Sequence, residues 1–346
     1  MFRYPVSDHC DGERFFNPHG KARPLKDVIT WMRTRERTAW PARVPLQLHP
    51  APPLTVAHGS VAVTWIGHST FLIRTASTVI VTDPVFTSHA GPYGRFGPPR
   101  VRPPAIPLDR MPPVDLVLVS HNHYDHLQPT SLRHFADRAS YVAPLGVATQ
   151  LQLPPDQPPP RLRRSAEALR AKAEGGSHGN RRESGRTIAE LDWWQSTGAG
   201  GAEITCVPAQ HFSARTPFDR DNTLWCGYVV RVDGVTIYFA GDSGYSPQFA
   251  EIGARFPSID LALLPIGAYE PRWFMSPVHM NPDDAVRAHR DVRPRLSIGM
   301  HFGTFQLTDE AIDEPIRALE RARATHGVTA EAFRVLDFGE SLILGT

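Results

Sequence analysis

One apolar run ends directly in a cluster of histidines, and this junction limits what the chain can fold into. Residues 114–120, VDLVLVS, form a continuous apolar run of the kind found in strands buried on both faces. The next six residues, 121–126, contain three histidines and an aspartate. Either this is a histidine-rich surface turn, or it is half of a metal site at the end of a buried strand.

The rest of the chain alternates between strand and helix patterns. β-Branched runs separated by turn residues occur before the histidine loop, at 61–66, 71–75 and 78–82, and residues 84–113 between them and the loop are rich in Pro, Gly and Arg. Later strand patterns at 140–144, 187–194, 202–209, 259–267, 295–300 and 333–338 are interleaved with helical patterns at 129–136, 246–255, 282–291 and 309–323. Residues 228–239 read as a hairpin with Asp233-Gly234 at its turn. The pattern predicts an α/β fold of stacked sheets covered by helices.

Two segments differ in composition from the rest of the chain. Residues 1–60 are polar and interrupted by prolines, with one helical pattern around 25–35, so we expect an N-terminal extension that packs on the core. Residues 61–346 then form the main domain. Residues 154–186 are rich in Pro, Arg and Gly with almost no β-branched residues, which predicts a disordered insertion.

Composition excludes several classes of protein. No segment approaches 18 uncharged apolar residues, so no membrane-spanning helix is expected. The first residues lack the apolar run of a secretory signal, and the three scattered cysteines fit a reducing compartment, so we expect a cytoplasmic protein. The formal net charge of +2 gives little reason to expect a nucleic-acid partner.

The spacing inside the histidine loop favours two metal ions over one. Alternate side chains share a face in an extended segment, so His121 and His123 can bind the same ion. A tighter turn after Tyr124 would direct Asp125 and His126 to a second ion nearby. Imidazole nitrogens and carboxylate oxygens are ligands that Zn²⁺ accepts.

Four ligands do not complete two metal shells, and the remaining candidates follow other apolar runs. His211, Asp242 and His301 each stand just after a strand pattern, where catalytic side chains usually lie. Each histidine alone would more often be a buried or capping residue, and Asp242 alone could be a turn residue. Together with the loop they predict a binuclear site.

These motifs resemble those of the metallo-β-lactamase superfamily. The superfamily pattern is HxHxDH after a buried strand, followed by strand-end His, Asp and His. The longer segments VTWIGHSTFLI, VSHNHYDHL, PAQHF, FAGDSGY, LPIGAYEPRWFM and HFGTF are similar to the N-acylphosphatidylethanolamine-hydrolysing phospholipase D branch. The resemblance covers most of the chain outside the first dozen residues and the insertion. It implies a metallo-β-lactamase αββα sandwich, with two stacked mixed sheets flanked by helices.

The resemblance also implies how the site is divided. One zinc ion would be held by His121, His123 and His211, and the other by Asp125, His126 and His301, with Asp242 bridging the two. Asp83 would support the metal loop from behind, and His68 would do the same, although either could be a simple turn residue. Iron or manganese suits the same nitrogen and oxygen ligands.

The implied activity is zinc-dependent phosphodiester hydrolysis. A hydroxide bridging the zinc ions would attack phosphorus and release phosphatidic acid and an N-acylethanolamine. Asp242 and His279 would be catalytic, with His279 orienting the substrate or protonating the leaving alkoxide. Arg272, Trp273 and Phe274 would contact the lipid, or Arg272 would pair with Glu270. Val278 departs from the family, where we expect Gln, and this departure bears on headgroup recognition. A phospholipid substrate further implies peripheral contact with a membrane, and a homodimer is left open.

Three other functions use the same scaffold. A lactonase or another small-molecule hydrolase would direct the metals at a carbonyl group. A nuclease would need a basic surface for nucleic acid, which only the Arg-rich insertion offers. A binding protein without activity would be expected to have lost ligands, but every ligand position is filled.

Overall fold

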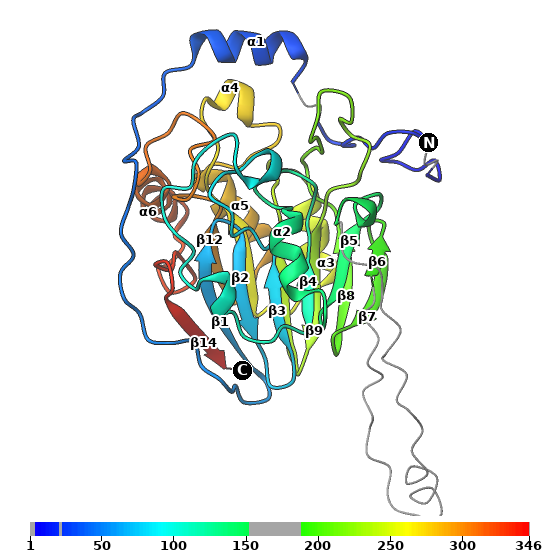
Figure 1. Ribbon diagram of the computed structural model, residues 1–346, viewed down its shortest axis with the longest axis vertical. Coiled ribbons are helices and arrows are strands. Elements are labelled where there is room, and N and C mark those ends of the chain that lie inside the picture. The colour runs from blue at the N-terminus through cyan, green and yellow to red at the C-terminus, as the bar shows by residue number, and fades with distance from the viewer. Residues whose placement is uncertain (1–3, 21–22, 152–187, 346) are drawn as a thin grey trace, which may run out of the picture.

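The strands form two mixed seven-stranded sheets that are stacked face to face, with helices on the outer faces (Figure 1). The computed structural model describes residues 4–20, 23–151 and 188–345. The predicted α/β class and the arrangement of two covered sheets are confirmed. The predicted disordered insertion, 154–186, lies outside the described residues.

The first sheet contains the strand that leads into the histidine loop. Its order is β14-β1-β2-β3-β4-β5-β6, antiparallel from β14 to β3 and parallel from β3 to β6. The strands are β1 Ser60–Gly67, β2 Thr70–Arg74, β3 Val79–Thr82, β4 Leu116–Leu118, β5 Ser140–Pro144, β6 Ile188–Leu191 and β14 Ser341–Gly345. The sequence analysis did not predict β14, which adds the last residues of the described chain to the edge beside β1.

The second sheet has the order β13-β12-β11-β10-β9-β8-β7, antiparallel from β7 to β10 and parallel from β10 to β13. Its strands are β7 Ser196–Ala199, β8 Ala202–Val207, β9 Gly227–Val232, β10 Val235–Phe239, β11 Leu261–Pro265, β12 Leu296–Met300 and β13 Phe333–Arg334. The predicted β9–β10 hairpin is confirmed. Both turn residues, Asp233 and Gly234, have positive φ (50° and 80°), as a tight hairpin turn requires.

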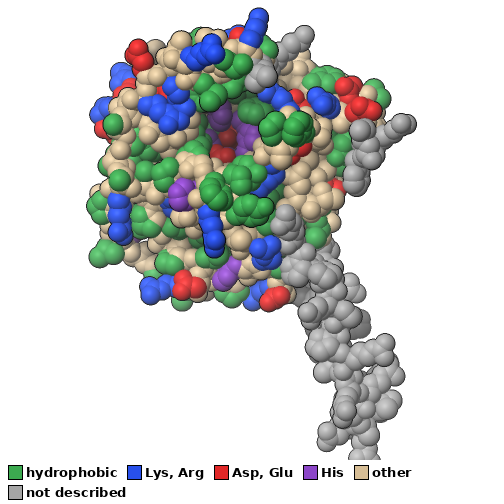
Figure 2. Space-filling model, turned by 45° about the horizontal axis from the view of Figure 1, so that its top comes forward, with side chains coloured by type: hydrophobic (Ala, Val, Ile, Leu, Met, Phe, Trp, Pro, Cys, Tyr) green, Lys and Arg blue, Asp and Glu red, His purple; other side chains and the backbone are tan. Residues whose placement is uncertain are grey.

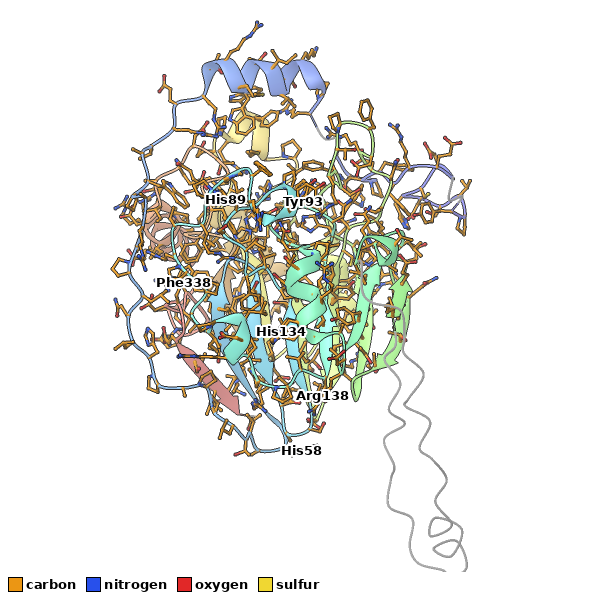
Figure 3. All side chains as sticks on the ribbon, viewed as in Figure 1. His58, His89, Tyr93, His134, Arg138 and Phe338 are labelled. Atoms are coloured by element: carbon orange, nitrogen blue, oxygen red, sulfur yellow. The ribbon has the colours of Figure 1, made fainter. Side chains whose placement is uncertain are left out.

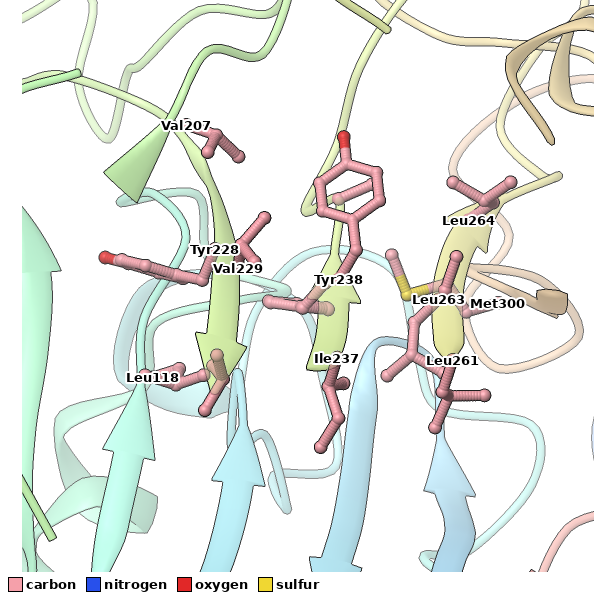
Figure 4. Packing of buried hydrophobic residues seen from close by; sticks show 14 of the residues in the cluster. Leu118, Val207, Tyr228, Val229, Ile237, Tyr238, Leu261, Leu263, Leu264 and Met300 are labelled. Carbon is pink, nitrogen blue, oxygen red and sulfur yellow. The ribbon is translucent and has the colours of Figure 1, made fainter. Parts of the chain in front are cut away.

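The main core lies between the sheets. Apolar side chains from β8 to β12 meet those of β1 to β4, and Figure 4 shows part of this packing around Leu118, Tyr228 and Ile237. One polar contact crosses the core: the buried hydroxyl of Tyr228 donates to the carbonyl oxygen of Val119 at 2.9 Å. This contact fixes the end of β4 just before the histidine loop begins.

Helices cover both sheets and one end of the sandwich (Figure 1). The α-helices are α1 Leu25–Thr34, α2 Pro129–Leu132, α3 Gln248–Arg255, α4 Arg272–Met275, α5 Pro282–Val292 and α6 Glu314–His326, and the 3₁₀ turns are Pro92–Gly94, Leu108–Arg110, Arg133–Phe135 and Ala148–Gln150. Among the described residues, none of these helices combines the length and the apolar composition needed to cross a bilayer.

Two helices differ from the expected pattern. Helix α6 begins at Glu314 instead of residue 309, because the side chains of Asp309 and Glu310 turn inwards to accept hydrogen bonds from Arg35 and from the backbone of Ala268. Residues 272–275, for which no helical pattern was identified, form the single-turn helix α4.

The N-terminal segment is held against the connection between β6 and β7 by a histidine that lies between two carboxylates. His9 Nδ1 lies 2.6 Å from Asp8 Oδ1 and Nε2 lies 2.7 Å from Asp192 Oδ1, and the ring stacks on Trp193 at 4.2 Å. Burial opposes protonation of His9, but the hydrogen bonds to Asp192 and Asp8 outweigh it, and the pKa is raised above 6.5. His9 therefore binds its proton more tightly in the folded chain than in the unfolded chain.

We expect the His9→Gln variant to be less stable by about 1–2 kcal/mol, since charge-assisted hydrogen bonds are lost. The pKa of His9 is raised on folding, so its stabilisation is complete below about pH 6.5 and is lost as the pH rises through the folded pKa. Urea unfolding of both proteins at pH 6 and pH 9 measures this, with the exposed His134 changed to Gln as the matched control (Figure 3). A difference in stability that is the same at both pH values would contradict the argument.

Candidate metal centre

The strand directions bring all the predicted ligands to one end of the sandwich. In the first sheet β1, β3 and β4 run the same way, and their carboxyl ends lead to His68, Asp83 and the loop 121–126. In the second sheet β8, β10 and β12 run the same way and lead to His211, Asp242 and His301. Figure 2 shows a hollow on this side of the molecule with histidine and acidic side chains at its floor.

Several strand ends adopt backbone conformations that side chains normally avoid. His68, Asp83 and His301 have φ of 55°, 33° and 64°. Such left-handed residues cost on the order of 1–3 kcal/mol each and concentrate at functional sites. Gly241, at φ +60°, precedes Asp242, and a Cβ atom there would lie 2.7 Å from the carbonyl oxygen of Cys226. Only glycine fits this approach between the strands.

Three imidazoles converge on one point. His123 Nδ1 lies 2.9 Å from His121 Nε2 and 3.1 Å from His211 Nε2. The outer nitrogen of His211 donates to the carbonyl oxygen of Val278 at 2.9 Å, which leaves the Nε2 lone pair directed inwards. Three ring nitrogens this close together suit ligation of a common ion better than hydrogen bonding to one another.

A second group forms beside the first. His126 Nε2 lies 3.1 Å from His301 Nε2, and Asp125 Oδ2 is 3.5 Å and 3.4 Å from these two nitrogens. His68 Nε2 is 3.0 Å from the same Asp125 oxygen. The donor atoms of these four residues all lie within 4.8 Å of one another. His68, which was expected only to support the metal loop from behind, therefore lies close enough to be a ligand itself.

Asp242 lies between the two groups. Its Oδ2 atom is 2.9 Å from His301 Nε2, 3.1 Å from His126 Nε2 and 3.8 Å from His211 Nε2. Its Oδ1 atom is buried and has no hydrogen-bond partner in the described part of the chain. A buried carboxylate oxygen without a partner is costly, and a bound cation would compensate it.

Asp83 supports both groups from behind. Its carboxylate accepts hydrogen bonds from Ser120 N at 2.7 Å, from Ser120 Oγ at 2.6 Å and from His126 Nδ1 at 2.6 Å. Since the Ser120 hydroxyl donates to Asp83, it accepts from His121 Nδ1 at 2.9 Å. These contacts occupy Nδ1 of both His121 and His126, so Nε2 is the nitrogen that each ring presents to the centre.

Before an ion binds, the ligands differ in ionisation state. Burial opposes protonation of His126 and His301, but the carboxylates of Asp242 and Asp125 outweigh it and raise the pKa of His126 well above its usual value and that of His301 to about 9, so both imidazoles must release a proton to bind metal. Burial lowers the pKa of His121 well below its usual value, that of His123 to about 3 and that of His211 to about 4. Burial opposes ionisation of Asp242, but the facing imidazoles of His126 and His301 hold its pKa well below the usual range. Neutral imidazoles and an ionised carboxylate are the binding forms.

The residues present fit a divalent transition metal. Five imidazoles and two carboxylates converge, a donor set that suits zinc and also iron or manganese. Within the described ranges, every converging group of three or more His, Cys, Asp or Glu side chains belongs to this end of the sandwich. Other histidines, such as His58 and His89, take no part (Figure 3).

The residues expected to bind substrate are divided between two places. His279 is buried beside the metal ligands, with its ring centroid 4.9 Å from that of His211 and its Nδ1 atom without a partner in the described chain. Arg272 pairs with Asp284 and donates to the carbonyl oxygen of His279, so the expected pair with Glu270 is wrong.

The two aromatic residues of α4 differ in their surroundings. Phe274 stacks on Trp31 of α1 at 4.9 Å, and Trp273 is partly exposed. Val278, where we expected Gln in the family, is buried, and it acts here through its backbone carbonyl on His211.

Arg215 supports the histidine loop and was not singled out from the sequence. Its guanidinium lies 4.0 Å from the ring centroid of Tyr124, and Nη1 donates to the carbonyl oxygens of Asn122 and Leu127 at 2.6 and 2.9 Å. These carbonyl groups flank the ligands of both groups. An arginine in a polar loop carries no local signal for such a role, because its partners are about 90 residues earlier in the chain.

Comparisons with known proteins agree with the fold and identify the family. Residues 78–302 match the family model described as a beta-lactamase superfamily domain. The chain is 36% identical over 288 residues to N-acyl-phosphatidylethanolamine-hydrolyzing phospholipase D 1 of Caenorhabditis elegans, covering 80% of this chain and 74% of that protein. It is 32% identical over 284 residues to a metal-dependent hydrolase of Pelotomaculum thermopropionicum, and the match covers 82% of this chain and 99% of that protein. The solved structure of a metallo hydrolase from Ignicoccus hospitalis superposes with a TM-score of 0.55 at 21% identity, and the match covers 83% of this chain and 99% of that chain.

We expect Asp242→Asn to lower the bound metal per chain and to reduce hydrolytic activity by about a thousandfold or more, because the amide removes the charge shared by the two groups. Metal analysis of the purified variant by mass spectrometry checks this without reference to any substrate. The exposed Asp313, changed to Asn, is the matched control. Full metal content in Asp242→Asn would exclude this carboxylate as a ligand.

Arg215→Lys should weaken metal binding about tenfold and destabilise the fold by about 1–2 kcal/mol, since an ammonium group cannot donate in the planar fork that guanidinium offers. Competition with a chelator and thermal unfolding measure the two effects. Arg138→Lys, an exposed arginine at the opposite end of the sheets, provides the control (Figure 3). Equal metal affinity in the two variants would show that the loop does not depend on Arg215.

Proposed function

This chain belongs to the metallo-β-lactamase superfamily of metal-dependent hydrolases, within the branch of the N-acylphosphatidylethanolamine-hydrolysing phospholipases D, and on that premise we propose that it hydrolyses a phospholipid phosphodiester. The position of Asp242 carries the proposal. Its Oδ2 atom lies within 3.8 Å of imidazole nitrogens from both groups, so two ions would share one carboxylate. Two neighbouring ions suit an in-line displacement at phosphorus, in which charge develops on several oxygens at once.

Bound metal would supply an activated water and offset the charge on the phosphoryl oxygens. The protein's own residues fix the geometry. Burial, followed by the nearby His211, lowers the pKa of His279 well below its usual value, so this imidazole is neutral near pH 7. A neutral ring with an unpaired Nδ1 favours orienting the substrate over donating a proton. Arg272 and its partner Asp284 hold the His279 backbone in place.

Apolar side chains in the loops around the site support a lipid substrate. Tyr93 is 83% exposed and Phe218 is 87% exposed, and Phe96 and Trp273 are also exposed. Tyr93 lies at the site end of the molecule (Figure 3), and Figure 2 shows apolar side chains around the hollow. Exposed aromatic residues are typical of surfaces that contact a membrane interface, so we propose peripheral binding through these loops.

Turnover of N-acylphosphatidylethanolamine in water enriched in ¹⁸O tests the proposed reaction. Cleavage on the phospholipase D side adds the water oxygen to phosphorus and breaks the bond from phosphorus to the ethanolamine oxygen. We expect one ¹⁸O atom in phosphatidic acid and none in the N-acylethanolamine. The metal-loaded protein should be assayed in parallel on lactones and on other phosphodiesters. Turnover of lactones alone, with a full complement of metal, would replace this proposal with the lactonase alternative.

The combined variant Tyr93→Ser, Phe96→Ser and Phe218→Ser should bind vesicles about tenfold more weakly, because three exposed aromatic contacts with the interface are removed. Sedimentation with phospholipid vesicles measures binding, and hydrolysis of a short-chain soluble substrate should be nearly unchanged. Leu54→Ser removes an equally exposed apolar side chain elsewhere and serves as the control. Unchanged vesicle binding in the triple variant would reject this surface.

A further inference from the structure

A second cavity lies outside the metal centre and is lined in part by the GAYEPRWFM segment. It has a volume of about 760 Å³ and lies between the end of α1, helix α4, the start of α5 and helix α6. Tyr269, Glu270, Pro271 and Trp273 line it, and none of the metal-directed side chains does. Four residues of the most distinctive motif of the chain therefore face a space outside the metal centre.

The cavity carries an excess of negative charge. Two guanidinium groups and six carboxylates line it: Arg35 and Arg321, and Glu36, Glu270, Asp283, Asp309, Glu310 and Glu314. Arg35 binds Asp309, and Arg321 binds Glu314, so both cations are already paired. The carboxylate of Asp283 lies 2.8 Å from Nε2 of His326.

Three carboxylates in the cavity, Glu36, Glu270 and Glu310, have no cationic partner in the described part of the chain. Glu310 is buried and accepts hydrogen bonds only from neutral donors: the N–H groups of Ala268 and Glu270, and the hydroxyl of Thr308. One oxygen of Glu270 accepts from Arg272 N at 3.0 Å, and the other has no partner among the described residues. Burial, and then the facing Glu310, raises the pKa of Glu270, as expected where negative charge is not compensated.

Tyr269 is a second and independent sign of a ligand. The residue is only 4% exposed, it lines the cavity, and its hydroxyl has no hydrogen-bond partner in the described chain. The hydroxyl is not fully enclosed, and since Tyr269 lines the cavity, its remaining exposure is to the cavity. A polar ligand in the cavity would give this hydroxyl the hydrogen-bond partner that the described chain does not give it.

The donor geometry points to an organic cation instead of a metal ion. Among the described residues, no three His, Cys, Asp or Glu side chains of this cavity bring their donor atoms within 4.8 Å of one another. The volume far exceeds one ion, and the indole of Trp273 and the phenol of Tyr269 offer aromatic surface. Carboxylate and hydroxyl oxygens accept hydrogen bonds, and a primary ammonium donates three.

We propose that this cavity binds a primary alkylammonium group, with the ammonium hydrogen-bonded between Glu270 and the Tyr269 hydroxyl and its carbon chain against Trp273. The site is separate from the metal centre and does not depend on the proposed reaction. The ammonium can come from a free amine or from the ethanolamine headgroup of a phospholipid, which presents the same chemistry.

Calorimetric titration of the metal-loaded full chain with ethanolamine and with tetramethylammonium tests the proposal. Both probes carry one positive charge, but only ethanolamine donates N–H bonds, so we expect it to bind at least about tenfold more tightly. Equal affinity for the two cations, or no saturable binding of ethanolamine up to about 10 mM, would overturn the proposal.

Conservative variants locate the binding. Tyr269→Phe keeps the ring and should weaken ethanolamine binding several-fold, and Glu270→Gln keeps the shape and should weaken it about tenfold. Asp313→Asn, an acidic residue outside the cavity, should have no effect. Ethanolamine affinity unchanged in both cavity variants would overturn the assignment. If either variant fails to fold, the comparison of the two cations on the unaltered protein still decides.

Binding to phospholipid vesicles distinguishes the two sources of the ammonium group. Binding to phosphatidylethanolamine vesicles over phosphatidylcholine vesicles, lost in Tyr269→Phe, would support a lipid headgroup as the occupant. Saturable binding of free ethanolamine with no preference between the vesicles would support a soluble amine. The vesicle preference and the calorimetry read out binding alone, so a protein inactive towards phosphodiesters would fail the proposed function without failing this one.

Discussion

The buried carboxylate of Asp83 is the interaction on which the candidate metal centre depends. It receives one hydrogen bond from His126 and, through the hydroxyl of Ser120, orients His121 as well. These two histidines belong to different donor groups. A single side chain at the end of β3 therefore sets the tautomer of one ligand in each group, and it does so from a left-handed backbone position that is itself strained.

The candidate ligands at this end of the molecule could be predicted from the sequence because short local motifs contain them. A buried strand followed by HNHYDH, and single ligands placed after other apolar runs, are patterns that a few neighbouring residues define. Strand directions then follow from the alternation of hairpins and crossovers, and they bring separate strand ends together. The donor atoms of His121, His123 and His211 lie in one group. Loop geometry suggested the pairing of His121 with His123, and the family resemblance implied that His211 joins them.

The features that were missed depend on partners far away in the chain. Arg272 pairs with Asp284 instead of Glu270, because the turn from α4 into α5 brings Asp284 within reach of its guanidinium. Helix α6 starts late because Glu310 is needed by the backbone of the GAYEP turn. Nothing near these residues in the sequence signals either contact. The same is true of Tyr269, whose motif suggested a lipid surface and whose hydroxyl faces a different cavity.

The spread of the metal-directed residues along the chain ties cofactor supply to folding. Their donor atoms come from loops between residue 68 and residue 301 and from both sheets, so they can converge only after the sheets have formed and docked. An unfolded chain offers at most the four donors of the loop 121–126. An ion bound by the full set therefore stabilises the native state by mass action, and the half-life of the protein in a cell would follow the free metal concentration around it.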